Sequence, residues 1–189
     1  MKEDLTIENQ IPNEEEVIRS SVENPEHFKI IYERYFRQLF LFILRRVGDK
    51  SLTGDITSQV FLKALTNLKK YQPRGLPFSA WLYRIAVNEC NDFFRRTKRT
   101  RVVILEEVHA EKLYEETVDH DPHEDVKRIL PRVLEKLRYE ELQLIELRFM
   151  ENRPFLEVAA ILGITENYAK VRTYRILAKM KKYFHEFGL

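Results

Sequence analysis

Residues 77–99, PFSAWLYRIAVNECNDFFRRTKR, constrain the fold more than any other segment, because their apolar positions recur with the period of an α-helix. One predicted face is apolar and suited to packing against other helices; it holds Leu82, Ala86, Val87, Cys90 and Phe94. A neighbouring stripe carries Trp81, Ile85, Asn88 and Asp92. At its end the segment leads into residues 95–101, which contain five cations and no acid: Arg95, Arg96, Lys98, Arg99 and Arg101. The chain must therefore build a helical core beside concentrated positive charge.

The rings and cations of this segment allow two interpretations. A cationic block attracts a polyanion by counterion release, and exposed rings stack on unpaired bases of any sequence. In the other interpretation Trp81, Tyr83 and Phe94 are ordinary core residues and the basic run is a solvated helix end. The segment alone does not decide between them.

Composition narrows the class of protein. With 189 residues, 44% hydrophobic and 33% charged, the chain can bury one or two modest cores. Its single cysteine, Cys90, excludes an intrachain disulfide and a cysteine metal cluster. The start, MKEDLTIENQ, has no signal-peptide pattern, and no apolar run is long enough to cross a bilayer. We therefore expect a cytoplasmic protein that does not insert into a membrane.

Charge is segregated along the chain and predicts its organisation. Residues 1–24 hold seven acids against two cations, and residues 104–126 hold nine against one. We predict a disordered acidic leader at 1–12, a helical domain at 13–100, an acidic linker at 101–125 and a second helical domain at 126–189. Helices are expected at 27–47, 54–71 and 77–99, with a loop at 72–77, and then at 126–137, 139–150, 154–162 and 166–184.

The last two predicted helices match a helix-turn-helix. They are joined by Gly163-Ile164-Thr165, and Thr165 is placed to cap the second helix. At 100° per residue the second helix separates a cationic side from an apolar side. The cationic side holds Arg172, Arg175, Lys179 and Lys182; the apolar side holds Thr173, Ile176, Leu177, Met180 and Phe184. Such a helix fits the major groove of DNA, although a cationic surface helix without a nucleic-acid role has the same pattern.

No catalytic pattern competes with nucleic-acid binding. The chain has no glycine-rich phosphate loop, no HExxH pair and no nucleophile elbow, so we expect no enzyme and no cofactor. His109, His120 and His123 stand near acids in the predicted linker, but acidic linkers are usually only solvated, and we predict no metal site. The residues alone predict an all-α, two-domain DNA-binding protein.

Three segments also resemble a known family. WLYRIAVNECNDFFRR, preceded by DITSQVFLKALTNLKKYQ and followed by EVAAILGITENYAKVRTYRILAKMKK, is similar to the alternative sigma factors of bacterial RNA polymerase, of the extracytoplasmic-function (ECF) type. The resemblance extends from Glu14 to Phe184. It implies a first domain that melts the minus-ten promoter element and a second that reads the minus-thirty-five element. The linker would pass through the RNA exit path of the enzyme.

The resemblance also implies roles for particular residues. Minus-ten, single-strand binding is expected at Tyr71, Phe78, Trp81, Asn88, Arg95, Arg96, Lys98 and Arg99. Minus-thirty-five, duplex binding is expected at Tyr168, Lys170, Val171, Arg172, Tyr174, Arg175 and Lys179. Docking on core polymerase, at the coiled coil of its largest subunit, is expected at Asp55, Gln59, Phe61 and Lys63; the flap is the other expected contact.

The chain departs from the family pattern at two places. Ser58 and Gln59 stand where a glutamine followed by an acid is common, and Glu166-Asn167-Tyr168 replaces a common valine-glycine-threonine run. A free-standing helix-turn-helix regulator stays open as an alternative function. The resemblance further implies an anti-sigma factor as a partner. Opposite charges on the linker and the basic patches are compatible with a closed form that masks itself, but whether the two domains pack together in the free protein stays open.

Overall fold

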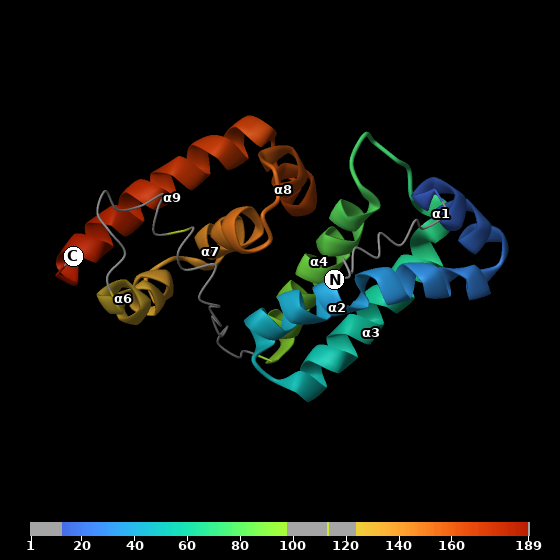
Figure 1. Cartoon of the computed structure of the whole chain (residues 1–189), viewed down its shortest axis with the longest axis horizontal. Coiled ribbons are helices and arrows are strands. Elements are labelled where there is room, and N and C mark those ends of the chain that lie inside the picture. Colours follow the sequence, from blue (N-terminus) through green and yellow to red (C-terminus); the bar gives the residue numbers. More distant parts are fainter. Residues whose placement is uncertain (1–12, 98–112, 114–123, 189) are drawn as a thin grey trace, which may run out of the picture.

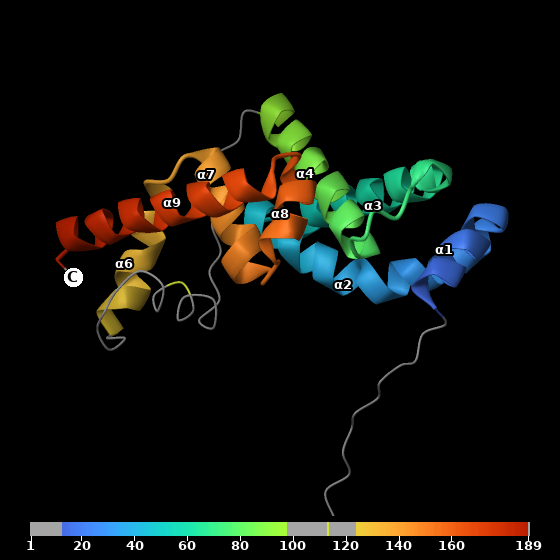
Figure 2. The same ribbon diagram turned by 90° about the horizontal axis from the view of Figure 1, so that it is seen from above.

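The computed structural model describes residues 13–97, 113 and 124–188. Within these ranges every regular element is a helix, which confirms the all-α prediction. The predicted leader and most of the predicted linker lie outside the described residues. Figure 1 shows two groups of helices packed side by side, and Figure 2 shows the same groups from above.

The first group, which we call the N-terminal unit, is built from three long helices and shorter pieces. Its elements are α1 (Glu14–Glu23), η1 (Pro25–His27), α2 (Phe28–Val47), α3 (Lys50–Asn67), η2 (Leu68–Lys70) and α4 (Phe78–Thr97). Gly48 ends α2 in the left-handed conformation, with φ 75°, so this helix ends at Val47 as predicted. Helix α4 contacts both α2 and α3, so it closes the core of this unit.

Helix α3 begins four residues earlier than predicted. The Asp49 side chain accepts a hydrogen bond from the Leu52 N–H at 2.9 Å and caps the helix at Lys50. The cap makes Gly54 an interior helix residue, where an added Cβ would contact nothing within 4 Å. The predicted start at Gly54 was wrong because a local side-chain cap outweighs the low helix propensity of one glycine.

The second group, which we call the C-terminal unit, contains the helix-turn-helix. Its elements are α6 (Glu124–Glu135), α7 (Tyr139–Ile145), the π-helical turn η3 (Glu146–Met150), α8 (Phe155–Leu162) and α9 (Glu166–Glu186). Gly163, with φ 69°, ends α8, and the Thr165 hydroxyl accepts from the Tyr168 N–H at 3.2 Å. The predicted turn and cap are confirmed. The helix predicted at 139–150 changes from α to π geometry at Glu146.

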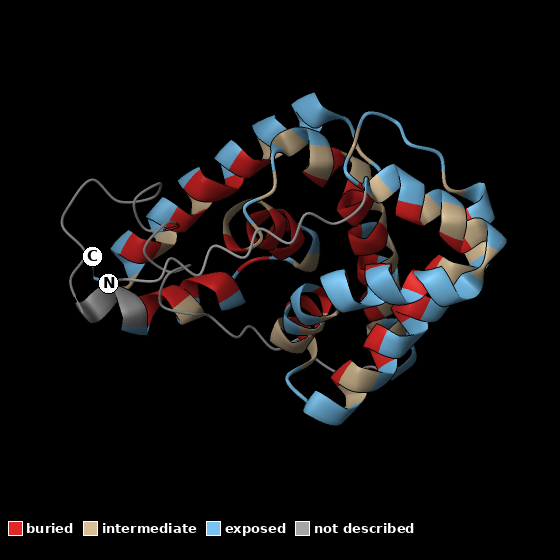
Figure 3. Cartoon of the chain, turned by 45° about the vertical axis from the view of Figure 1, so that its right-hand side comes forward, coloured by how far each residue is buried: buried red, intermediate tan, exposed pale blue. Residues whose placement is uncertain are grey.

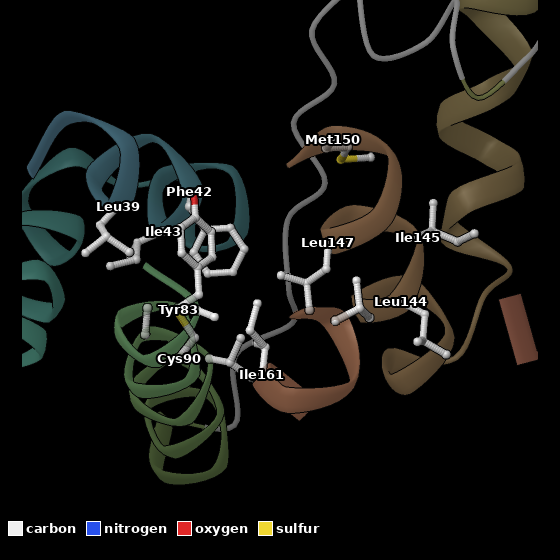
Figure 4. Close-up of a cluster of buried hydrophobic side chains, with 14 of the residues drawn as sticks. Leu39, Phe42, Ile43, Tyr83, Cys90, Leu144, Ile145, Leu147, Met150 and Ile161 are labelled. Carbon is white, nitrogen blue, oxygen red and sulfur yellow. The ribbon is translucent and has the colours of Figure 1, made fainter. Parts of the chain in front are cut away.

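The two units share one hydrophobic core. Helix α4 packs against α8, and the buried apolar side chains of both units form a single cluster. Figure 3 shows buried residues on the facing sides of the two groups, with exposed residues on the outer faces of the helices. In Figure 4, Ile161 of α8 points toward Tyr83 and Cys90 of α4. The structure thus has a closed form, in which the two units pack against each other.

The core explains the rings of residues 77–99. Leu82, Ala86, Val87 and Cys90 are buried as predicted, and Tyr83 is buried with them at 0% exposure. Trp81 and Phe94 are half-buried, which leaves part of each ring on the surface. Tyr83 therefore belongs to the core, whereas Trp81 remains available at the surface.

Candidate nucleic-acid interface

A groove of about 660 Å³ runs along the outer side of α4 and the end of α3. Cations line it together with amides, the Trp81 ring and two acids, Glu89 and Asp92, which pair with Lys63 and Arg95; its other residues include Lys70, Arg84, Asn88 and Asn91. Asn88 is exposed on the wall that α4 supplies, because the buried face of this helix turns Leu82, Ala86 and Cys90 inward. Positive charge and amide groups beside a ring are the chemistry that a single nucleic-acid strand requires.

An aromatic cluster stands beside this groove, where the loop before α4 returns to the helix. The ring centroid of Trp81 lies 5.1 Å from that of Tyr71 and 5.3 Å from that of Phe78. Phe78 is 1% exposed and meets Tyr71 edge-on at 4.9 Å. Phe78 thus supports the two outer rings from beneath, while Tyr71 and Trp81 keep partly exposed faces. Burial of the Tyr71 hydroxyl, followed by the charges of Glu14 and Glu15, raises its pKa, so the ring stays neutral.

The cations after the groove are only partly within the described residues. Arg95 is exposed and pairs with Asp92, with Nη2 and Oδ1 2.8 Å apart, and Arg96 is exposed. Lys98 and Arg99, the other predicted cations of this cluster, lie outside the described residues. Their role remains a prediction from the sequence.

Helix α9 buries one side and exposes the other, as predicted. Its buried residues are Ala169, Thr173, Ile176, Leu177, Met180 and Phe184. Its first turns present a continuous exposed surface made by Tyr168, Lys170, Val171, Tyr174 and Arg175. Tyr168 and Tyr174 are each 54% exposed, and the Tyr174 ring lies beside that of Phe155 of α8, with the ring centroids 6.3 Å apart.

Two cations of α9 are held inside the C-terminal unit by Glu141 of α7. Glu141 is 4% exposed and accepts hydrogen bonds from Lys179 Nζ at 2.7 Å and Arg172 Nη2 at 3.3 Å. It also accepts from the backbone N–H of Arg138 at 2.9 Å. Burial opposes ionisation of Glu141, but the hydrogen bonds from Lys179 and Arg138 outweigh it and hold the pKa of this carboxyl below its usual range. Glu141 therefore fixes α9 against α7 and orients Arg172 and Lys179.

Sequence reasoning missed Glu141. The signal available was an acid three residues after Arg138 at the start of a predicted helix, which is typical of capping. That signal says nothing of Arg172 and Lys179, which lie 31 and 38 positions away in the sequence. Only the packing of α9 on α7 brings these charges together.

The residues predicted to dock on polymerase are divided between surface and core. Asp55 and Gln59 are exposed on α3, whereas Phe61 is 4% exposed and packs against Tyr32, with ring centroids 4.8 Å apart. Lys63 pairs with Glu89 of α4 and lines the groove that contains Asn88. Asp55, Gln59 and Lys63 thus form the exposed part of the predicted docking surface. Phe61 sits beneath it.

In the part of the chain that the structure describes, His, Cys, Asp and Glu side chains form no group that could hold a metal ion. None of the helices within the described ranges is long and apolar enough to span a bilayer.

Comparison with known proteins defines the class. Residues 31–100 match the family Sigma-70 region 2, and residues 133–182 match Sigma-70, region 4. The RNA polymerase sigma factor SigV of Bacillus subtilis is 31% identical over 148 residues, which are 78% of this chain and 82% of SigV. The chain belongs to the RNA polymerase sigma factors of the ECF type, which direct the enzyme to promoters.

A longer relative and two solved structures complete the comparison. The ECF RNA polymerase sigma factor BldN of Streptomyces coelicolor is 28% identical over 171 residues, 88% of this chain, and the match spans 63% of BldN. The structure of CnrH in complex with the cytosolic domain of CnrY matches 90% of this chain and 96% of its own, with a TM-score of 0.61 and 21% identity. The sigma factor RpoE in complex with the anti-sigma factor NepR from Bartonella quintana matches 84% and 96%, with a TM-score of 0.59 and 16% identity. The two structures agree with this chain in fold.

The carboxylate of Glu141 gives a prediction for stability. Because its pKa is lowered in the folded state, Glu141 contributes stability above its usual pKa of 4.5, and this contribution is lost as the pH falls through the folded value. Glu141→Gln should lower the free energy of unfolding by about 1 to 3 kcal/mol at pH 7. Urea unfolding from pH 7 to pH 3 should show the difference from wild type shrinking in acid. Glu140→Gln, at an exposed neighbour, is the control, and a difference that is constant with pH would contradict the assignment.

Proposed function

We propose that the N-terminal unit captures an unpaired base of the minus-ten element and that α9 reads the minus-thirty-five element as duplex. One observation carries the proposal: a single chain combines the Asn88 groove beside exposed rings with a helix-turn-helix whose outer face is exposed. Because the chain belongs to the ECF sigma factors, we prefer this function to that of a free-standing helix-turn-helix regulator.

The minus-ten role rests on the groove and the aromatic cluster. A base that leaves the helical stack loses stacking energy, which hydrogen bonds and apolar walls must offset. Tyr71 and Trp81 provide the walls, with Phe78 beneath them, and the Asn88 amide can both donate and accept. Arg95 and Arg96, with Lys98 and Arg99 beyond the described residues, hold the phosphates.

The minus-thirty-five role rests on the exposed face of α9. Tyr168, Lys170, Val171, Tyr174 and Arg175 meet the major groove, where an arginine can pair bidentately with guanine. Arg172 and Lys179, which Glu141 holds, lie at the edge of this face and are positioned for phosphate rather than base contact.

The remaining partners follow from the same assignment. Core polymerase docks at the exposed residues Asp55 and Gln59, with Lys63 at the edge of the groove and Phe61 supporting the surface from below. The polymerase supplies the bond-forming chemistry, in the cytoplasm, and this chain is not itself an enzyme. An anti-sigma factor, of the kind bound to the sigma factor RpoE in its complex with NepR, is the proposed inhibitor.

Run-off transcription tests the function as a whole. Core RNA polymerase with this protein should produce a discrete transcript from its promoters, which can be found by sequencing the RNA made on fragmented genomic DNA. Core polymerase alone is the control. A failure to raise specific initiation above that control would contradict the proposal.

Asn88→Ala should impair promoter opening more than polymerase binding. The loss of one base hydrogen bond in the groove, about 1 to 2 kcal/mol, corresponds to opening weakened roughly 5- to 30-fold. Opening is measured by permanganate reactivity of unpaired thymines, and core binding by a competition assay. Gln38→Ala, an exposed amide on α2 outside the groove, should change neither quantity. Equal losses in both assays for Asn88→Ala would refute the base-pocket role.

Arg175→Ala should weaken recognition of the upstream duplex. If Arg175 contacts a guanine, its loss costs about 1 to 3 kcal/mol and raises the Kd of holoenzyme for promoter DNA by roughly 5- to 150-fold. Promoters whose minus-thirty-five element has been replaced should respond little to the substitution. Lys182→Ala, an exposed cation further along α9, is the matched control. The assignment fails if Arg175→Ala lowers binding to both promoter kinds alike.

A further inference from the structure

The N-terminal and C-terminal units are joined by a set of buried charges. Arg45 of α2 forms an ion pair with Glu151, and the Tyr83 hydroxyl donates to Glu151 Oε2 at 2.5 Å. Next to them, Arg46 Nη2 lies 2.8 Å from Glu146 Oε2. We call these five residues the charged clasp. Glu146 is the first residue of the π-helical turn η3, and Glu151 directly follows it. The geometry of this turn places both acids toward α2 and α4.

Further polar contacts extend the clasp along α4. Arg153 Nη1 donates to the Ser79 hydroxyl at 2.9 Å, and its guanidinium lies 4.3 Å from the Tyr83 ring centroid. Farther along the helix, Gln143 Nε2 donates to Asn91 Oδ1 at 2.9 Å, and the Tyr139 hydroxyl donates to the same oxygen. Polar contacts therefore bind the C-terminal unit to α4 from its first turn to Asn91.

The Arg46–Glu146 pair is costly for a protein interior. The side chains are 0% and 5% exposed, and none of the three guanidinium nitrogens of Arg46 has a well-aligned hydrogen-bond acceptor. Two groups offset the loss of hydration of the Arg46 guanidinium. They are the Glu146 carboxylate and the Phe42 ring, whose centroid lies 4.1 Å from the guanidinium. Buried ion pairs of this kind stabilise less than apolar residues of equal volume, because each ion loses its hydration. Both ions regain that hydration when the units separate.

Closure also limits access to the rings proposed to hold the minus-ten base. A crevice of about 420 Å³ has Tyr71 and Trp81 on one wall and Ala160, Gly163 and Ile164 of the helix-turn-helix on the other. The turn that leads into α9 thus faces the aromatic cluster. The minus-ten and minus-thirty-five elements are separated by about 25 base pairs, roughly 85 Å of duplex at 3.4 Å per pair. Two surfaces that share one crevice cannot reach both elements.

We propose that the charged clasp is an autoinhibitory contact, which holds the free sigma factor closed and keeps its two DNA-binding surfaces together until the units separate. This inference rests on the proposed function for the meaning of the two surfaces, but the clasp itself is defined by contacts that do not depend on DNA. Its buried charge makes the closed state easier to open than an apolar interface of the same size.

Two variants of the same pair separate this proposal from a general loss of stability. Glu146→Leu leaves the Arg46 charge buried without its carboxylate, which favours separation of the units. Arg46→Leu combined with Glu146→Leu removes both charges and gives an apolar contact, which favours closure. If Glu146→Leu only destabilised the fold, adding Arg46→Leu would destabilise it further. If Glu146→Leu opens the clasp, adding Arg46→Leu should restore the closed form.

The experiment measures the distance between the units in the full chain. Nitroxide labels at Ser58→Cys on α3 and Lys182→Cys on α9, both exposed, are placed in a Cys90→Ala background and read by double electron–electron resonance. We expect a short, narrow distance distribution for the clasped protein and for the double variant. Glu146→Leu should give a longer and broader one. If Glu146→Leu does not fold, Glu151→Gln takes its place, because the neutral amide weakens the contacts to Arg45 and Tyr83 while keeping their shape.

A single-stranded oligonucleotide bearing the minus-ten sequence of an identified promoter gives the second readout. Its Kd for the protein without polymerase should fall roughly tenfold in the opened variant and return to the wild-type value or above in the double variant. Unchanged distances in the folded single variant would overturn the clasp. Longer distances without tighter oligonucleotide binding would overturn autoinhibition. Run-off transcription by wild type is unaffected by either result, so a failure here is distinct from a failure of the proposed function.

Discussion

The structure depends on helix α4 having two buried faces instead of one. Leu82, Ala86 and Cys90 are fully or almost fully buried, and so is Tyr83 on the adjoining side, because α2 and α3 cover the helix within the N-terminal unit while α8 covers it from the C-terminal unit. A helix packed on two sides keeps only a narrow exposed stripe. On α4 that stripe carries Asn88 and leads to Arg95, so the demands of packing determine which residues are left to form the groove.

The same principle orders the charges of the C-terminal unit. Of the cations on helix α9, Arg172 and Lys179 are paired with Glu141 of α7, which fixes them against that helix. Held cations lose little conformational freedom when they meet a phosphate, because their side chains are already ordered. Tyr168 and Arg175 are exposed and belong to the face that is proposed to meet bases. A buried acid can therefore improve a surface that binds a polyanion.

Features encoded by neighbouring residues were predictable from sequence. The periodicity of residues 77–99 predicted the buried face of α4, and Gly163 with Thr165 predicted the turn and cap of the helix-turn-helix. The start of α3 was predicted wrongly because Gly54, a residue of low helix propensity, suggested a boundary, whereas the true cap is a single hydrogen bond to the Asp49 side chain. Glu141 and the charged clasp could not be predicted, since Arg45 and Glu151 are 106 positions apart and in the sequence each is one charge among many. Long-range ion pairs have no periodicity to reveal them.

The contact between the units combines two opposing contributions to the free energy of closure. Apolar side chains such as Ile161 and Cys90 favour closure by removing their surface from water. Arg46 and Glu146 oppose it by the hydration that they give up, which their mutual attraction only partly restores. A sum of opposing terms leaves a small net preference, and a ligand shifts such an equilibrium by its difference in affinity for the two states. Under the proposed function, only the separated units can contact the minus-ten and minus-thirty-five elements at the same time, so promoter DNA supplies that difference. An entirely apolar interface would need a much larger difference in affinity before the units separated.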